Sequence, residues 1–584
     1  MIAAIGYLQT YPLGESNMNL STALKFAFMT ALTAILAYSV LVLSPGISVL
    51  GSNSTSYLGP ASELNDTAFL NVTSALNGAV LASDGVQASV RDARAYAPEG
   101  QELEEIISDF ENYTEKSMRE WLVPGLAVAV VRGDQVIYLH CFGNKTASGG
   151  DPVTPGTIFQ IGSNSKAFTA ALVAMMVDDG LIGWDDRVVD HLSDFRMYDP
   201  WVTREFRVKD LLTHNSGLPA MAGDDLITLG YGPEKEMQAL GQIEPATSFR
   251  SSYSYDNILF LWAAKLVEAK TGKTWEECLS QRIFLPLDMK NTSSGLSAFL
   301  EAKDAAGWHK LKDNEISSGK IVTLPRDWKY RDWVYGVGPA GGINSNIFDM
   351  AKWLTLHTNG SINGKNILGQ DNLDLMHSPL ILASNEQKLF GGMGWLYEEY
   401  SPDPIVWHNG GTFGHHSMVA LIPESKLGIV VLSDSFVGLP DLLAYWFFDR
   451  YFENPQRDYS AESKAECLNI EELRKAYAIK PPVPSDPSLP LDRYAGNYSN
   501  EIYGLMNITV RDERLVATMG PRGLEAFFSH WNRDSFLANV PEFMNMTSSA
   551  VFNVGPDGKA ESVSMLLFIE GEKGSKAEFK RCAA

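Results

Sequence analysis

The chain has 584 residues and a formal net charge of −23, with 45% hydrophobic and 20% charged residues. This composition is that of a globular protein, and the length exceeds what one hydrophobic core usually supports, so we expect two domains with appendages. The acidic balance and the lack of a dense Lys/Arg run exclude nucleic acid as a partner, because polyanion binding depends on basic patches that release counterions.

The first 50 residues contain an apolar segment, 26–43, of about 18 residues without a charge, close to the minimum for a membrane span. Lys25 flanks it on one side, and Pro45 with Gly46 ends it. The pattern predicts entry into the secretory pathway, through either a cleaved signal peptide or a signal anchor with a single N-terminal span. The protein would then be secreted or membrane-anchored, and the sequence leaves both open.

Asparagine sequons support a secretory route. Roughly four N-x-S/T triplets are expected by chance, and the chain has an excess of them. The glycosylation candidates are Asn53, Asn65, Asn71, Asn112, Asn144, Asn291, Asn359, Asn497, Asn507 and Asn545. Four cysteines are too few for a disulfide scaffold but allow up to two bridges, whose pairing the sequence does not reveal.

The predicted elements follow in chain order. After a Ser/Asn-rich stalk at 51–104, residues 126–143 read as two strands joined by a Gly-Asp turn. Helical stretches follow, notably 166–179 and 257–270, and two more strands occupy 415–435. Strands first, helices in the middle and strands last predict a mixed α/β domain over 105–455 whose terminal strands share one antiparallel sheet flanked by helices.

A second domain follows a linker. Residues 456–488 are predicted to be this linker, since the stretch 479–492 is rich in proline and therefore semi-rigid. Residues 489–584 alternate like short antiparallel strands separated by turns such as Pro-Asp-Gly, and predict a small all-β domain. Its position after the linker suggests two roles, restricting access to a site or mediating a homo-oligomer.

Residues 159–180, FQIGSNSKAFTAALVAMMVDDG, place Ser163 and Lys166 three positions apart at the start of an apolar helix. Ser163 is a suitable N-cap and first residue of the helix, but a capping box needs Glu or Gln at position 166. A lysine there opposes the helix dipole and enters the core. Both effects lower its pKa and favour a neutral amine that accepts a proton. The pair therefore predicts a nucleophile, Ser163, and its base, Lys166.

Three similar patterns are rejected. Ser165 is adjacent to Lys166 rather than one turn away, so it is not the predicted nucleophile. Residues 317–320 also spell SxxK, but in a polar, helix-breaking stretch that we expect to be a loop. Residues 270–272 spell KTG, yet they end a helix at which Gly272 is the stop signal.

Two downstream motifs supply partners for the serine and lysine. Tyr255-x-Asn257 precedes an apolar helix, where a phenol can relay a proton and an amide can orient lysine and substrate. The alternative for Tyr255 is a packed aromatic whose hydroxyl caps a backbone group. His408-x-Gly410 is expected at the start of a strand, with its ring against the substrate, while Gly410 and Gly411 allow the backbone to approach closely.

Together, SxxK, YxN and HxG resemble the serine β-lactamase-like hydrolases, which include class C β-lactamases, DD-peptidases, esterases and D-amino-acid peptidases. The stretches LLTHNSGLP (211–219) and GPAGGINSNIFDMAKWL (338–354) are also typical of that group. The resemblance covers about 105 to 450. The block from YAGNYSN onward resembles the lipocalin-like β-domain of some peptidase-type members.

The resemblance implies a role for each motif residue. Ser163 would be acylated and Lys166 would be its base, bonded to Tyr255, which would protonate the leaving group or activate the deacylating water. Asn257 would orient Lys166 and the acyl side of the substrate. The amides of Ser163 and Gly411 would form the oxyanion hole. Because His408 replaces the lysine of true β-lactamases, a permanent cation for a substrate carboxylate is missing, which favours esterase or peptidase activity over penicillin hydrolysis.

Three functions stay open. The first is a serine hydrolase that cleaves an ester or amide of a small-molecule or peptide-like acyl substrate. The second is an acyltransferase of secondary metabolism that uses the same acyl-enzyme, and the third is a catalytically idle binding or assembly module. No cofactor is expected. His408, His415 and His416 lack HExxH or Cys/His spacing, so no metal site is predicted either.

Overall fold

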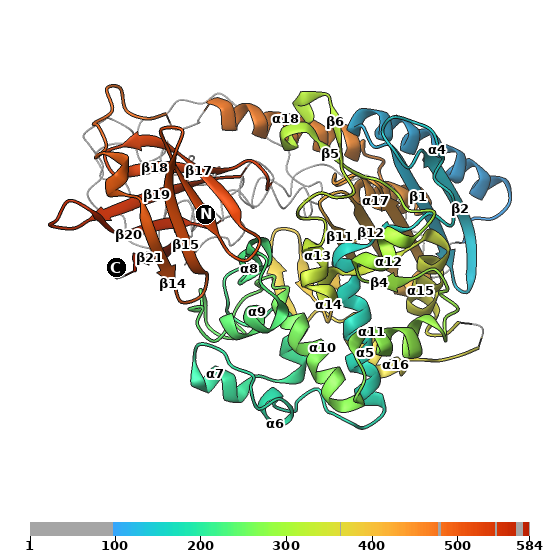
Figure 1. Cartoon of the computed structure of the whole chain (residues 1–584). Coiled ribbons are helices and arrows are strands. Elements are labelled where there is room, and N and C mark those ends of the chain that lie inside the picture. Colours follow the sequence, from blue (N-terminus) through green and yellow to red (C-terminus); the bar gives the residue numbers. More distant parts are fainter. Residues whose placement is uncertain (1–96, 363, 477–479, 544–545, 568–575, 583–584) are drawn as a thin grey trace, which may run out of the picture.

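A computed structural model describes residues 97–362, 364–476, 480–543, 546–567 and 576–582 (Figure 1). The apolar segment 26–43, most of the expected stalk and the candidates Asn53, Asn65, Asn71 and Asn545 lie outside these residues. Within the described ranges, no helix has the length and apolarity needed to cross a membrane. Entry into the secretory pathway therefore stays a prediction.

The larger domain is built on an eight-stranded antiparallel sheet in the order β2-β1-β13-β12-β11-β10-β9-β8. The strands are β1 Gly125–Arg132, β2 Gln135–Gly143, β8 Ile381–Ser384, β9 Leu389–Gly391, β10 Leu396–Glu398, β11 Ile405–Gly411, β12 His416–Ile422 and β13 Leu427–Ser433. The first strand pairs with the last, with Val128 opposite Val431. The prediction that the terminal strands share one sheet is confirmed.

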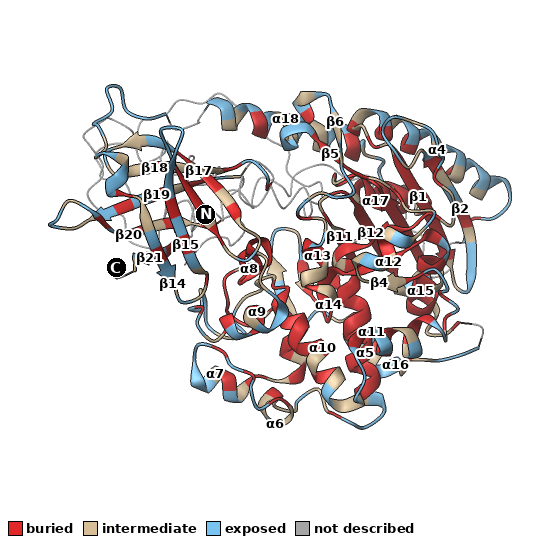
Figure 2. Ribbon diagram, in the orientation of Figure 1, coloured by how far each residue is buried: buried red, intermediate tan, exposed pale blue. Residues whose placement is uncertain are grey.

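Helices cover both faces of this sheet, which is why its central strands are apolar on both sides. Helices α4 (Gln101–Trp121) and α17 (Leu439–Tyr451) pack on one face, where the Phe110 ring lies 5.3 Å from that of Phe447. Helix α15 (Ile347–Asn359) packs on the other. In Figure 2 the central strands β1, β12 and β13 are almost entirely buried, whereas the edge strand β2 and the outer face of α4 are partly exposed. The sheet is therefore a rigid support for the elements at its edge.

The helical region between the strands contains two buried helices, α5 (Ser165–Asp178) and α10 (Ile258–Thr271). They match the helices predicted at 166–179 and 257–270, and Gly272 ends α10 with a φ of 68°. The shorter helices are α6 Val188–His191, α7 Pro200–Glu205, α8 Asp224–Leu229, α9 Pro233–Ala239, α11 Trp275–Leu279, α12 Leu296–Glu301, α13 Trp333–Gly336, α14 Gly338–Gly341 and α16 Gln370–Met376. Minor strands are β3 Phe159–Gln160, β4 Ser293–Ser294, β5 Trp308–Leu311, β6 Ile321–Leu324 and β7 Ile343–Ser345.

Two local predictions were wrong. Ser163 does not begin the helix: it lies in a 3-10 turn, Gly162–Asn164, and α5 starts at Ser165. His408 is in the middle of β11 rather than at the start of a strand, because residues 405–407 already pair with β10 and β12. In both cases the tertiary contacts of the site, rather than local propensity, set the boundary.

The segment 456–488, expected to be a linker, begins with helix α18 (Tyr459–Ala476). This helix is tied to the larger domain, since the Tyr459 hydroxyl donates to Asp449 at 2.5 Å and the Trp121 indole donates to the Ser460 hydroxyl at 3.0 Å. An irregular proline-rich stretch follows at 480–490.

The C-terminal domain is a closed barrel of eight antiparallel strands in sequence order, and the small all-β domain is thereby confirmed. Tyr498 of the first strand lies opposite Arg581 of the last, which closes the barrel. Buried aromatic rings, among them Tyr494, Phe536 and Phe552, fill part of its interior. The strands are β14 Gly496–Asn500, β15 Gly504–Arg511, β16 Arg514–Met519, β17 Leu524–Asn532, β18 Ser535–Val540, β19 Met546–Val554, β20 Ala560–Leu566 and β21 Lys576–Arg581.

Loops of the barrel contact the larger domain (Figure 1). The Arg522 guanidinium donates to Asp332 at 2.6 Å, and the Arg522 backbone N–H donates to the Leu229 carbonyl at 2.9 Å. The Phe543 ring packs 4.9 Å from Tyr330, measured between ring centroids. These contacts place the barrel beside the segment 325–336.

The described glycosylation candidates differ in how exposed they are. Among the described sequons, Asn112, Asn291, Asn497 and Asn507 are exposed, whereas Asn144 and Asn359 are half-buried. Glycosylation of these residues stays a prediction. The cysteines form no disulfide, and all are free thiols: Cys141, Cys278, Cys467 and Cys582.

Candidate active site

Ser163 lies in a tight turn between β3 and the buried helix α5. Gly162 enters the turn with a φ of 52°, a conformation that favours glycine. The Ser417 hydroxyl fixes the turn to β12, since it donates to the Ile161 carbonyl at 2.7 Å and accepts from the Asn164 amide at 2.8 Å. Ser163 is partly exposed while both of its chain neighbours are buried, so its hydroxyl can meet a substrate.

The end of β11 lies directly against this turn. A Cβ added to Gly410 would clash with the Ile161 carbonyl oxygen, and one added to Gly162 would lie 2.8 Å from the Gly411 nitrogen. Only glycines allow two backbones to approach so closely. The amides of Ser163 and Gly411, which we expect to form an oxyanion hole, thus belong to segments in contact, and their catalytic role stays a prediction.

Lys166 is fully buried, and its amine lies among three hydrogen-bond acceptors. Its Nζ lies 3.3 Å from the Ser163 Oγ, 2.7 Å from the Asn257 Oδ1 and 3.1 Å from the Ala340 carbonyl oxygen. Three acceptors suit the three protons of an ammonium, whereas a neutral amine keeps two protons and one lone pair. Loss of one proton therefore leaves a lone pair that can accept from Ser163.

Burial lowers the pKa of Lys166 to about 7, although Asp224 and Asp256 act in the opposite direction. A buried ammonium is poorly solvated, which favours the neutral form. A base with a pKa near neutrality is also the most effective proton acceptor at neutral pH. Lys166, which is unfavourable in a simple helix cap, thus has a pKa suited to a general base.

Tyr255 completes the contacts of the serine. Its hydroxyl donates to the Ser163 Oγ at 2.7 Å, and the Lys166 Nζ lies 4.6 Å from the centre of its ring. The His214 ring stacks on Tyr255 at 4.6 Å, and the His214 Nδ1 accepts from the Asp256 backbone N–H at 3.1 Å. Tyr255 is therefore held in place by a buried, neutral imidazole.

Three residues near the site had not been singled out from the sequence: His214, Asp224 and Asp256. The Asp224 carboxylate accepts from the Asn257 Nδ2 at 2.7 Å, which fixes the amide whose other end accepts from Lys166. Burial and the nearby Asp256 raise the pKa of Asp224 well above its usual range. Asp256 is the middle residue of the YxN motif, and His214 belongs to the stretch LLTHNSGLP. Both stretches were recognised in the sequence, but nothing in their spacing assigned a role to these two residues. Asp224 had only its place at the start of α8.

His408 is buried beside Tyr255, with ring centroids 6.4 Å apart. Burial, with the charge of Lys166, lowers the pKa of His408 to about 3. The ring is therefore neutral at physiological pH and is not a cation for a substrate carboxylate.

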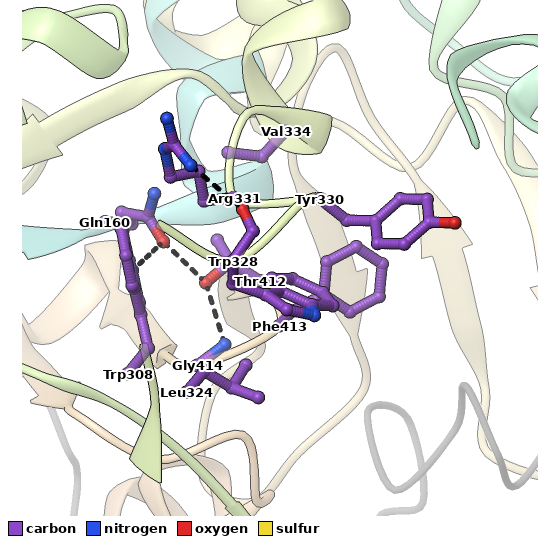
Figure 3. A pocket seen from close by; sticks show the side chains of 10 residues that line it. All are labelled: Gln160, Trp308, Leu324, Trp328, Tyr330, Arg331, Val334, Thr412, Phe413 and Gly414. Carbon is purple, nitrogen blue, oxygen red and sulfur yellow. Dashed lines mark hydrogen bonds between the residues drawn. The ribbon is translucent and has the colours of Figure 1, made fainter. Parts of the chain in front are cut away.

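A pocket lies next to the serine turn (Figure 3). Gln160 forms one side, and its Oε1 accepts from the Trp308 indole at 3.0 Å and the Thr412 hydroxyl at 2.9 Å. Trp328 and Phe413 form an aromatic wall, with ring centroids 5.3 Å apart. The wall is apolar, and the polar groups beside it are held by hydrogen bonds.

The serines of the rejected patterns, Ser165 and Ser317, have structural contacts instead. The Ser165 Oγ accepts from the Ile343 backbone N–H at 3.1 Å, which is a structural role. Ser317 belongs to a surface turn that Glu471 of α18 holds. His416 pairs with Asp441 at 3.1 Å, and in the described part of the chain no three His, Cys, Asp or Glu side chains are arranged to hold a metal ion.

This geometry agrees with comparisons to known proteins. Residues 110–451 match the family model described as beta-lactamase, so the chain belongs to the serine β-lactamase-like family, whose members are in general serine hydrolases. Residues 480–580, which contain the barrel, match a domain of unknown function, DUF3471. The predicted family and fold are confirmed.

Similar proteins are named as hydrolases and penicillin-binding proteins. The chain is 26% identical over 496 residues to unguisins hydrolase ungD' of Aspergillus campestris (strain IBT 28561), covering 78% of this chain and 89% of the relative. It is 27% identical over 332 residues to penicillin-binding protein 4 of Amycolatopsis lactamdurans, covering 54% and 82%. An octameric penicillin-binding protein homologue from Pyrococcus abyssi has the same fold, with a TM-score of 0.51 and 21% identity over 81% of this chain and 100% of that one.

Proposed function

We propose that this protein is a serine hydrolase that cleaves an ester or amide bond of a small or peptide-like substrate through an acyl-enzyme on Ser163. The observation that carries the proposal is the position of the Ser163 Oγ, 3.3 Å from the buried Lys166 amine and 2.7 Å from the Tyr255 hydroxyl. Nucleophile and base within hydrogen-bond reach, with the base oriented by further groups, are the signature of covalent catalysis.

In acylation, the Ser163 Oγ attacks the substrate carbonyl carbon while its proton moves to neutral Lys166. The tetrahedral intermediate then collapses, the bond to the leaving group breaks, and a proton from Lys166 passes through the Tyr255 hydroxyl to the departing oxygen or nitrogen. In deacylation a water attacks the acyl carbon, gives its proton to the same base and releases the acid, which restores Ser163. Asn257, fixed by Asp224, holds the amine in place.

The test compares hydrolysis of a p-nitrophenyl ester and a p-nitroanilide by wild type, Ser163→Ala and Lys166→Ala. We expect a loss in kcat of about 10³-fold or more for each variant, since nucleophile and base act as one unit. Ser317→Ala, in the other SxxK sequence, is the matched control and keeps wild-type rates. Turnover by Ser163→Ala at the wild-type rate would rule the proposal out and favour an idle module.

A further inference from the structure

Helix α8 lies between the C-terminal barrel and the catalytic residues, and it contacts both. It has only six residues, Asp224–Leu229, and all of them are buried. At its first residue, the Asp224 carboxylate accepts from the Asn257 amide at 2.7 Å. At its last residue, the Leu229 carbonyl accepts from the Arg522 backbone N–H of the barrel at 2.9 Å. Six residues of helix span about 9 Å, so one short element separates the barrel from the catalytic amide.

The catalytic end of α8 has a second connection to the site. The Asp224 backbone N–H donates to the Met221 carbonyl at 3.1 Å, and the Met221 N–H donates to the Tyr255 carbonyl at 2.8 Å. The segment that leads into α8 therefore holds the backbone of Tyr255. Asp224 in turn holds Asn257, whose other end accepts from Lys166 at 2.7 Å. Two residues of the proposed machinery thus depend on where this helix starts.

The barrel packs closely on the other end of α8. Gly520 has a φ of 63°, and a Cβ added to it would lie 2.4 Å from the Leu229 carbonyl oxygen. The residue after the helix, Gly230, is equally close to the barrel, since its added Cβ would lie 2.7 Å from the Arg522 Cβ. Glycine on both sides permits an approach that a larger side chain would prevent.

Further contacts extend this one towards α9, which lies with α8 beside the barrel (Figure 1). The Tyr231 hydroxyl donates to the Tyr503 carbonyl at 3.1 Å, and the Lys235 amine of α9 donates to the Glu501 carbonyl at 3.1 Å. Phe543, in contrast, packs on the segment 325–336 at the pocket wall. The contact of the barrel with α8 is therefore separate from its contact with the pocket.

We propose that the barrel, through its contact with α8, positions the amide of Asn257 and with it the base Lys166. Gly520 and Arg522 are positioning residues in this arrangement, because they act through α8 rather than on the substrate. Catalytic groups must be held within about 0.5 Å of their productive positions, so a small shift of α8 is enough to lower the rate. The inference rests on the proposed hydrolase function and gives the barrel a part in the chemical step.

The test compares Gly520→Ala with Gly523→Ala in the full chain. The two glycines belong to the same loop and have φ values of 63° and 62°, so alanine introduces the same backbone strain at both. Only Gly520→Ala disturbs α8, because a Cβ on Gly523 would have no atom within 4 Å. The measured quantities are kcat and KM for p-nitrophenyl acetate and p-nitrophenyl phenylacetate, and the pH at which kcat/KM falls on the acid side. Denaturant unfolding shows whether the variants are folded.

We expect Gly520→Ala to lower kcat by about tenfold for both esters, a size typical of coupling between separate sites, and Gly523→Ala to stay close to wild type. An effect on access would instead alter KM, and more for the larger ester.

The pH profile gives a second readout. Asp224 raises the pKa of Lys166, so displacement of Asp224 in Gly520→Ala should move the acid limb to lower pH. Asp256, the other carboxyl group that acts on Lys166, is not part of α8. In an Asp224→Asn background, Gly520→Ala should leave the limb unchanged, since the carboxyl group that carries the shift is already absent.

Tyr231→Phe is the second variant, and it decides the question should Gly520→Ala not fold. It removes only the hydroxyl that reaches the Tyr503 carbonyl, so kcat should fall by about threefold for both esters. Wild-type kcat in the folded variants would overturn the inference, as would a change confined to KM or an undiminished limb shift in the Asp224→Asn background. Turnover by Ser163→Ala would contradict the hydrolase proposal instead, so the two failures are distinguishable.

Discussion

At the scale of single residues, the proposed chemistry depends on a lysine whose burial disfavours its charged form. Lys166 is buried by α5, α10 and α14, and only Asp224 and Asp256 favour its charged form. Its hydrogen bonds to Ser163 and Asn257 fix the direction of the amine. The balance between burial and the two carboxyl groups sets the pKa of Lys166, and with it the pH at which the proposed base would be active.

This balance predicts an acid limb in the pH profile. Since the neutral amine is the base, kcat/KM for a neutral ester should fall as pH drops through about 7 and reach a plateau above it. Initial rates across a buffer series measure this limb. A profile that stays flat from about pH 9 down to about pH 5 would contradict the assignment of Lys166 as base.

Asp224→Asn tests the positioning of the base. An asparagine can still accept from the Asn257 amide, but it removes a carboxyl group that raises the pKa of Lys166. The acid limb should therefore move to lower pH, and the rate at the plateau should change less than its position. An unshifted limb would show that Asp224 is only structural.

At the scale of elements, the site is a junction between the turn 162–164 and the end of β11. Gly410→Ala should be disruptive, because the new Cβ would clash with the Ile161 carbonyl. We expect a loss of about 1–3 kcal/mol or more in the free energy of unfolding and a large fall in kcat. Denaturant unfolding and ester kinetics measure both.

Gly156→Ala is the control for that substitution. Its Cβ would have 3.6 Å to the nearest atom, the Thr154 hydroxyl, so stability and kcat should be close to wild type. A Gly410→Ala variant as stable and active as this control would mean that β11 does not support the serine turn as described.

The sequence predicted the positions of the helices and strands more accurately than the contacts between them. Helices α5 and α10 lie within one residue of the predicted ranges, because their apolar runs and Gly272 are local signals. The 3-10 turn before α5 and the place of His408 inside β11 were missed, since packing between the two segments decides them. Asp224 is distant in sequence from Ser163, and no spacing rule connects the two.

At the scale of the whole molecule, the barrel contributes to the surroundings of the pocket. Phe543 of the barrel contacts Phe413 and Tyr330, which both line it, with centroid distances of 5.3 and 4.9 Å. Arg522 fixes the adjoining loop to Asp332. An effect of the barrel on substrate access, like a role in a homo-oligomer, stays a prediction, and these contacts are the basis for testing it.

Phe543→Ala tests this role. Loss of the ring should loosen the wall of the pocket, so KM for phenylacetyl esters should change by roughly threefold or more, while acetyl esters are hydrolysed at nearly the wild-type rate. Leu505→Ala, on an exposed part of the barrel (66% exposed), is the control and should change neither. Equal behaviour of the two variants on all esters would show that the barrel has no part in substrate selection.

The central claim is that Ser163 forms the acyl-enzyme, and the most direct measurement is mass spectrometry of the protein after reaction with a fluorophosphonate. One adduct per chain is predicted, on the peptide that contains Ser163, with no adduct on folded Ser163→Ala. Labelling should decline with the protonation of Lys166 below about pH 7. An unlabelled but folded wild type, or an adduct on another residue, would contradict the account.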